Sequence, residues 1–163
     1  EDSIENWSDE KFWKELKKRL PHNAAKNLIT GPSIEKSIAP LRSFVAEPMK
    51  YGSMFLVGDA AHIVPPTGAK GLNLAFSDVY YLHQAMNNYY NDKNKTAINL
   101  YSKKALKRVW KTMRFSWWMT TTLHKFPGQS SFDQRIQETE LEYLKSSTFS
   151  QRALAENYVG LPF

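Results

Sequence analysis

The sequence contains no cysteine, few glycines and no long apolar run. Without cysteine there is no disulfide framework, no thiolate metal site and no cysteine nucleophile. The seven glycines, at positions 31, 52, 58, 68, 71, 128 and 160, never form the Gly-x-Gly-x-x-Gly spacing of a dinucleotide-binding turn. No stretch reaches the roughly 18 apolar residues of a membrane span, and no signal-like run opens the sequence. We therefore expect a soluble, cytoplasmic protein with no membrane contact.

Composition bounds the size and the partners of the chain. Its 163 residues are 42% hydrophobic and 13% aromatic, enough to build the core of one domain. The formal net charge is +6, but the lysines and arginines recur at helical spacing. This spacing favours the solvated faces of amphipathic helices over a phosphate-binding surface, so no nucleic acid partner is expected. The histidines show no two-histidine-one-carboxylate spacing, and no metal site is expected.

Helical periodicity dominates the chain. Ser8 is suited to cap a first helix, which Pro21 ends, and a short second helix is predicted over about 23–29. The stretch 34–45 has extended character, and Pro40 restricts any strand there to an edge or a break. The predicted fold class is α+β and mostly helical.

The second half of the chain is predicted to be helical almost throughout. A helix of about five turns is indicated by apolar residues at spacings of three and four, namely Leu72, Ala75, Val79, Leu82, Met86 and Tyr89. The helix predicted over about 96–124 is apolar nearly all round, so it must be covered on several sides. A further helix is expected to start at a Ser131-x-x-Gln134 capping box, followed by one or two helical turns before Tyr158.

A polar motif lies between the extended segment and the third predicted helix. Met54–Val57 is a short apolar run typical of a buried strand, and it ends in Gly58-Asp59. Pro65-Pro66 keeps the backbone extended, and Thr67-Gly68 allows it to turn before the helix begins at Leu72. The free N–H groups of a helix start attract a ligand of negative character. An ordinary strand-to-helix connection without a ligand is the alternative.

The residues of this motif resemble those of a known family. Gly58-Asp59-Ala60-Ala61-His62 followed by Pro65-Pro66-x-Gly68-x-Lys70-Gly71-Leu72-Asn73 resembles the second FAD-binding motif of the single-component aromatic hydroxylases, which are flavoprotein monooxygenases. Three further segments, 38–44, 114–120 and 156–162, are similar to members of that family that act on 4-hydroxybenzoate. The resemblance runs from about Trp7 to the end of the chain.

The resemblance implies that the chain is the C-terminal part of a longer enzyme with a two-domain, glutathione-reductase-like α/β fold that binds FAD and NAD(P). Residues 1–50 would end the substrate-binding domain, 51–90 would supply the last strand, the FAD loop and a helix, and 91–163 would form a C-terminal helical region. The full-length enzyme is expected to be a homodimer. The alternative is a catalytically inactive fragment that serves only in packing or dimerisation.

The activity implied by the resemblance is hydroxylation of 4-hydroxybenzoate to 3,4-dihydroxybenzoate with FAD, NADPH and O₂. Three residues are expected to take part in catalysis. Tyr158 would relay the phenolic proton of the substrate, the Pro66 carbonyl would accept the substrate hydroxyl, and Thr67 would touch the substrate or the flavin.

Nine residues are implied to hold FAD, namely Arg42, Gly58, Asp59, Pro66, Gly68, Lys70, Gly71, Leu72 and Asn73. Asp59 would accept hydrogen bonds from the ribityl hydroxyls, since a carboxylate is an acceptor-only group. The N–H groups of Leu72 and Asn73, with the Lys70 cation nearby, would face the flavin edge on which negative charge develops.

Each of these roles has a structural alternative. Arg42 and Lys70 are equally suited to a solvated surface, and Tyr158 to a place in the core. His62 is interpreted as a structural histidine that closes the loop in preference to a catalytic base.

Overall fold

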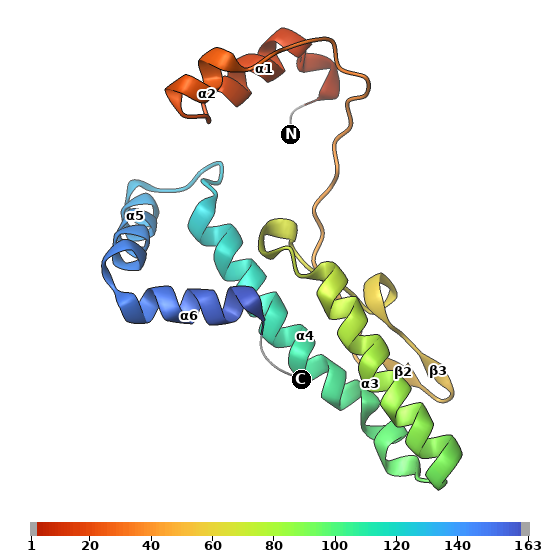
Figure 1. The fold of residues 1–163 in the computed structure, drawn as a ribbon. Helices are drawn as coiled ribbons and strands as arrows, with labels where there is room; N and C mark the ends of the chain where they lie inside the picture. The colour runs from red at the N-terminus through yellow and green to blue at the C-terminus, as the bar shows by residue number, and fades with distance from the viewer. Residues whose placement is uncertain (1–2, 161–163) are drawn as a thin grey trace. The chain divides into compact units, whose positions relative to one another are not determined.

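Helices make up most of this protein. The computed structural model describes residues 3–160, which contain six α-helices, three short 3-10 helices and four strands of two residues each (Figure 1). The mostly helical fold predicted from the sequence is confirmed. Contacts divide the chain into two units, Glu1–Pro40 (unit 1) and Leu41–Phe163 (unit 2). This boundary falls before position 50, and the assignment of 1–50 to a substrate-binding domain stays a prediction.

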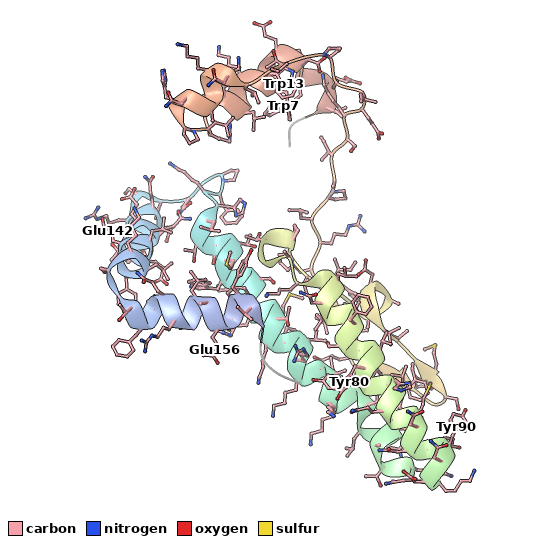
Figure 2. All side chains as sticks on the ribbon, viewed as in Figure 1. Trp7, Trp13, Tyr80, Tyr90, Glu142 and Glu156 are labelled. Atoms are coloured by element: carbon pink, nitrogen blue, oxygen red, sulfur yellow. The ribbon has the colours of Figure 1, made fainter. Side chains whose placement is uncertain are left out.

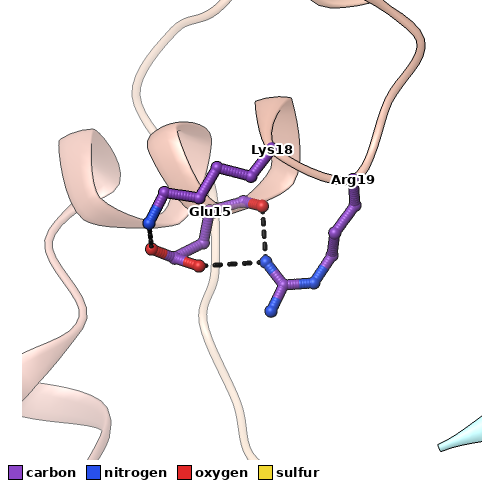
Figure 3. Close-up of polar contacts among 3 residues, drawn as sticks. All are labelled: Glu15, Lys18 and Arg19. Carbon is purple, nitrogen blue, oxygen red and sulfur yellow. Dashed lines mark hydrogen bonds and ion pairs between the residues drawn. The ribbon is translucent and has the colours of Figure 1, made fainter.

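Unit 1 contains the 3-10 helix η1 (Ile4–Asn6) and the helices α1 (Asp9–Lys17) and α2 (His22–Asn27). The predicted cap is present, because the Ser8 hydroxyl accepts a hydrogen bond from the Lys11 N–H at 3.2 Å. Near the end of α1, Glu15 contacts Lys18 at 2.5 Å and Arg19 at 3.0 Å (Figure 3). Hydrogen bonds from these two cations lower the pKa of the Glu15 carboxyl. They lie near the carbonyl end of α1, where positive charge is favoured.

The segment after α2 folds back along α1 without regular structure. The Trp13 indole donates to the Gly31 carbonyl at 2.8 Å, and the Asp9 carboxylate accepts from the Ser33 N–H at 3.1 Å. Lys36 pairs with the other Asp9 oxygen at 2.6 Å and donates to the Trp7 carbonyl at 2.9 Å. Figure 2 shows Trp7 and Trp13 in this unit.

Unit 2 is built on two long helices, α3 (Gly71–Asp92) and α4 (Lys95–Leu123), which lie side by side as a hairpin (Figure 1). The turn between them is short because Lys93 adopts the left-handed conformation, with φ of 57°. Asn94 then caps α4 by accepting from the Thr96 N–H at 2.8 Å. Within residues 3–160 no helix, not even α4 with its 29 residues, is apolar enough to cross a bilayer.

The core of unit 2 lies where α3 and α4 meet the chain that precedes α3. Its members are Met49, Ala61, Val64, Leu74, Tyr81, Tyr101, Ala105 and Val109. Two α4 side chains hold that preceding chain by its backbone. Ser102 accepts from the Met49 N–H at 2.9 Å, and the Tyr101 hydroxyl donates to the Leu56 carbonyl at 2.7 Å. Burial, and then the charge of Asp78, raise the pKa of Tyr101.

The buried face of α3 is not its most apolar face. The buried residues are Leu74, Ser77, Asp78, Tyr81 and Ala85. By contrast, Leu72 and Val79, which belong to the apolar stripe seen in the sequence, are 71% and 52% exposed. Tyr80 and Tyr90 also lie along the exposed side of this helix (Figure 2).

The strands form two separate antiparallel ladders. β1 (Phe44–Val45) pairs with β4 (His62–Ile63), with Val45 opposite His62, and β2 (Lys50–Tyr51) pairs with β3 (Met54–Phe55). The prediction of a buried strand over Met54–Val57 was therefore wrong. Only Met54 and Phe55 are in a strand, and Met54 is 57% exposed, because the segment turns back on β2 through Gly52 at φ of 57°.

Two predictions about the last helices were also wrong. α5 (Ser131–Ser146) is capped by Ser130 and not by Ser131, because Asp133 sits three residues after Ser130 and its carboxylate accepts from the Ser130 N–H at 3.2 Å. α6 (Thr148–Val159) is a full helix of 12 residues and not one or two turns, because the Ser147 hydroxyl caps it by accepting from the Ser150 N–H at 3.2 Å.

We expect Asp9→Asn to loosen the return segment of unit 1. The Lys36 and Ser33 contacts lower the pKa of Asp9 from 3.8 to about 2, so the carboxylate is favoured in the folded state. Its stabilisation is therefore present above about pH 4 and is lost as the pH falls towards 2. In hydrogen exchange, the protection factor of the Ser33 amide should fall over that pH range in the wild type and be low at every pH in the variant. Glu10→Gln on the same helix is the control, and equal exchange in both variants would contradict the prediction.

Candidate functional site

The motif loop (residues 58–70) begins with a turn that presents Asp59. Gly58 has φ of 60°, a conformation that favours glycine, and it starts the 3-10 helix η2 (Gly58–Ala60). The Asp59 side chain is exposed on this turn. Arg42 is exposed two residues before β1, which pairs with the part of the loop after η2. The ladder continues with the Ala46 N–H donating to the Ala61 carbonyl at 2.7 Å.

The second turn of the motif loop, η3 (Pro66–Gly68), is pressed against α4. Thr120 donates its hydroxyl hydrogen to the Ser116 carbonyl at 2.8 Å, so the Thr67 hydroxyl is the donor in the 2.8 Å contact between Thr67 and Thr120. A side chain at Gly68 would not fit, since a Cβ there would lie 2.9 Å from the Ser116 hydroxyl oxygen. Thr67 and Gly68 thus fix the turn to α4.

The start of α3 has no side-chain cap. The residue at the cap position is Lys70, whose side chain makes no capping hydrogen bond, and the first intrahelical bond is from Leu74 N–H to the Lys70 carbonyl at 2.9 Å. The other four helices of nine residues or more are capped by a side chain, at Ser8, Asn94, Ser130 and Ser147. Among these five helices, α3 is therefore the one whose first N–H groups, at Gly71, Leu72 and Asn73, have no side-chain cap at all.

Lys70 joins the motif loop to the end of α6. Its ammonium donates to the Tyr158 carbonyl and lies 5.1 Å from the centre of the Tyr158 ring and 5.7 Å from that of Phe115. Tyr158 also packs edge-on against Phe115, with ring centres 6.4 Å apart. A second link is made by Arg114, which donates to the Asn157 side chain at 2.8 Å. Segments far apart in the sequence are thus brought to one place.

A cleft of about 410 Å³ opens beside Lys70, between α3, α4 and the end of α6. Its lining includes Lys70, Arg108 and Lys111 and no acidic residue. Burial, and then the charge of Arg108, lower the pKa of Lys70. This wall of the cleft is therefore suited to a group of negative charge.

The most buried polar contact near the motif loop was missed in the sequence. His62 Nε2 and Asp78 Oδ2 are 2.6 Å apart, and the two side chains are 1% and 0% exposed. The same Asp78 oxygen accepts from the Gly58 N–H at 3.0 Å. The prediction that His62 closes the loop agrees with this contact. The sequence does place an aspartate, Asp78, among the apolar residues of the helix predicted from Leu72 onward. The spacing of residues did not identify its partners.

The structure brings some of the predicted residues together and leaves others apart. Lys70 contacts Tyr158, while Thr67 and Gly68 are fixed to α4 close by. Within residues 3–160, no hydrogen bond or ion pair links Arg42 or Asp59 to them. The segment 156–162 carries part of the resemblance, and its residues 161 and 162 lie outside the described residues. In the described part of the chain, no three histidine, aspartate or glutamate side chains gather as metal ligands.

We expect Gly68→Ala to destabilise unit 2 by about 1–3 kcal/mol, because the new methyl group overlaps the Ser116 hydroxyl. Ser116 Oγ is buried without a hydrogen-bond partner, so Ser116→Ala should be neutral or stabilising and should restore much of the loss in the double variant. Urea unfolding measures the free energy of unfolding of the two single variants and of the double variant. Gly31→Ala, where nothing lies within 4 Å, is the control. Equal losses at Gly68 with and without Ser116→Ala would refute the overlap.

Comparisons with known proteins agree with the cofactor that the motif loop predicts. The family described as FAD binding domain matches residues 1–116. A p-hydroxybenzoate hydroxylase of Acinetobacter baylyi is 60% identical over 99% of this chain, which spans 40% of that protein's length. A rifampicin monooxygenase of Streptomyces venezuelae is 54% identical over 37 residues, 23% of this chain and 8% of that protein. FAD, the cofactor predicted from the motif, is thereby confirmed at the level of the family. With most of its length matched, this chain belongs to the FAD binding domain family.

Proposed function

We propose that this chain is the C-terminal part of a flavin-dependent hydroxylase that converts 4-hydroxybenzoate to 3,4-dihydroxybenzoate with NADPH and O₂. The proposal is supported by the p-hydroxybenzoate hydroxylase to which the chain is 60% identical. The structural observation that carries it is the contact of Lys70 with Tyr158. This contact joins the residue expected to handle the substrate proton to the loop expected to hold the flavin.

The residues of the motif loop fit FAD. FAD would supply the oxygen-activating chemistry after its reduction by NADPH. The exposed Asp59 carboxylate is suited to accept hydrogen bonds from a polyol such as the ribityl chain. The uncapped N–H groups at Leu72 and Asn73 are suited to an oxygen-rich, electron-accepting ring edge. Lys70, Arg108 and Lys111 add positive charge on the same side of α3.

Two oxygen atoms of this chain would contact the phenolic hydroxyl of the substrate. The Tyr158 hydroxyl would relay its proton, and the Pro66 carbonyl would accept its hydrogen bond. Tyrosine hydroxyls and phenols have similar acidity, so a proton passes between them with little free-energy penalty. The Tyr158 side chain is 53% exposed and its ring is held by Lys70 and Phe115. The Pro66 carbonyl already accepts from the Ala69 N–H at 2.8 Å, and its second lone pair is available to a substrate hydroxyl.

Thr67 would act indirectly, through the contact of its side chain with α4. Its hydroxyl is committed to Thr120 as a donor, and this bond fixes the turn that carries Pro66. The role proposed for Thr67 is therefore to hold the Pro66 carbonyl in place.

The exposed apolar stripe of α3 supports the proposed two-domain, glutathione-reductase-like fold. Leu72, Phe76 and Val79 lie four and three residues apart and are 71%, 64% and 52% exposed. Large apolar side chains on one face of a helix are normally covered. Since the chain spans 40% of its relative, the remaining part of a full-length enzyme is the proposed cover.

A second apolar surface supports the proposed homodimer. Phe132 and Tyr143 on α5 are 71% and 54% exposed, and Phe149 on α6 is 77% exposed. Aromatic side chains are enriched at the centres of protein interfaces. We propose that α5 and α6 form part of the dimer contact of the full-length enzyme.

In the full-length enzyme, Asp59→Ala should weaken FAD binding. The ribityl hydroxyls would lose a charged acceptor, which is worth about 1.5–3 kcal/mol, or about 10- to 150-fold in the dissociation constant. Quenching of flavin fluorescence on titration of the apoenzyme measures this constant. Asp92→Ala, an exposed aspartate at the opposite end of α3, is the control. The same dissociation constant in wild type and Asp59→Ala would exclude the proposed contact.

Tyr158→Phe in the full-length enzyme should separate proton relay from packing. The ring contacts with Lys70 and Phe115 remain and only the hydroxyl is lost. Substrate should still bind, but fewer NADPH oxidations should yield 3,4-dihydroxybenzoate and more should end in hydrogen peroxide. The measurement is product formed per NADPH oxidised. Tyr51→Phe, at an exposed tyrosine of β2 to which no role is given, is the control. A wild-type ratio and rate in Tyr158→Phe would mean that this tyrosine is structural.

A further inference from the structure

Asp78 is a buried carboxylate to which neither the motif nor the proposed reaction gives a role. It lies on α3 and is 0% exposed, and its Oδ1 atom has no hydrogen-bond partner in the described part of the chain. Burial of a carboxylate is unfavourable unless hydrogen bonds compensate for the lost water. Two hydrogen bonds compensate here, from Gly58 and His62, and both reach the same atom, Oδ2.

The two partners of Asp78 lie on either side of Asp59 in the motif loop, at the start of η2 and in β4. Gly58 immediately precedes Asp59, and its N–H donates to Asp78 at 3.0 Å. His62 follows three residues after Asp59 and lies 2.6 Å from the same oxygen. As a carboxylate, Asp78 can only accept, so His62 Nε2 carries the hydrogen of this contact. Asp78 therefore holds the η2 turn on both sides of Asp59.

The same helix carries the other predicted flavin contacts. Leu72 and Asn73 are in the first turn of α3, and Asp78 is about 9 Å further along the axis of this continuous helix. The turn and the helix also approach closely, since a Cβ built on Gly58 would lie 3.4 Å from that of Ala75. A shift of the η2 turn along α3 would change the distance between the Asp59 carboxylate and the helix start.

We propose that Asp78, acting through Gly58 and His62, is a positioning residue that sets the distance between the Asp59 carboxylate and the start of α3. One FAD molecule can then engage both at once. This inference rests on the proposed function, because it presumes that Asp59 and the start of α3 both contact FAD. Asp78 itself touches no ligand.

The test is a double-mutant cycle in the full-length enzyme with the variants Asp78→Asn, Asp59→Ala and their combination. Asparagine keeps the size of the side chain but removes the charge that holds the turn. Asp78→Asn should weaken FAD binding about tenfold or more in the wild-type background and less than about threefold in the Asp59→Ala background. A residue that acts only on fold stability would give the same factor in both backgrounds.

Ser77→Ala is the matched control. Ser77 is the neighbouring residue on α3, is also 0% exposed, and its hydroxyl donates only within the helix, to the Leu74 carbonyl at 2.7 Å. Urea unfolding of each apoenzyme compares the stability losses. FAD affinity should be unchanged by Ser77→Ala even where the loss of stability matches that of Asp78→Asn.

A second pair of variants serves if Asp78→Asn does not fold. The amide of His62→Gln can donate to Asp78 and should keep FAD affinity within about threefold of wild type, whereas His62→Leu cannot donate and should lose about tenfold or more. Equal affinities of these two variants would overturn the proposal. So would equal effects of Asp78→Asn in both backgrounds, or an equal effect of Ser77→Ala. If the wild type bound no FAD, the proposed function would fail as well. If it bound FAD and Asp59→Ala weakened it, those outcomes would refute only the positioning role.

Discussion

The packing of α3 against α4 is the contact on which the rest of unit 2 depends. The strands of this chain are two residues long, and ladders of that length are not stable alone. The segment before α3 is held instead by α4, through Ser102 to the Met49 N–H and through Tyr101 to the Leu56 carbonyl. The motif loop is then fixed to the same helix where Thr67 meets Thr120. Within unit 2, contacts with α4 thus hold both the motif loop and the segment that precedes it.

The features that sequence predicted well are those set by neighbouring residues. The cap at Ser8 and the long helix that ends before His124 follow from local hydrogen bonding and apolar spacing. The FAD motif was found because its residues are contiguous. The features that were missed join distant residues, such as Thr67 with Thr120 and Gly58 with Asp78. The local spacing of residues does not indicate such pairs. The sequence therefore identified the motif but not the contacts that fix it in place.

The α3 helix shows why apolar periodicity can indicate a helix without identifying its buried face. Of the apolar stripe, Leu72 and Val79 are exposed and Leu82 packs against the core, while the fully buried residues of this helix include Ser77 and Asp78. Hydrogen bonds offset part of the cost of burying these polar groups, because the serine bonds to its own helix and Asp78 Oδ2 accepts from two donors. The polar face specifies the position of the loop, and the apolar face is suited to bury area against a further part of the protein.

The folded state holds the charged form of Lys70 at a cost in free energy, which a ligand of opposite charge would reduce. Burial and the nearby Arg108 lower its pKa, so the folded state disfavours the charged form. While the lysine is charged the folded protein bears that penalty, which disappears as the pH rises through the lowered pKa. The Tyr158 carbonyl and two aromatic rings hold the ammonium but carry no negative charge. A ligand edge that gains negative charge next to Lys70 removes the penalty. In the proposed function, the attraction of a flavin edge to Lys70 would grow as that charge develops, which would favour the reduced form of the flavin over the oxidised form.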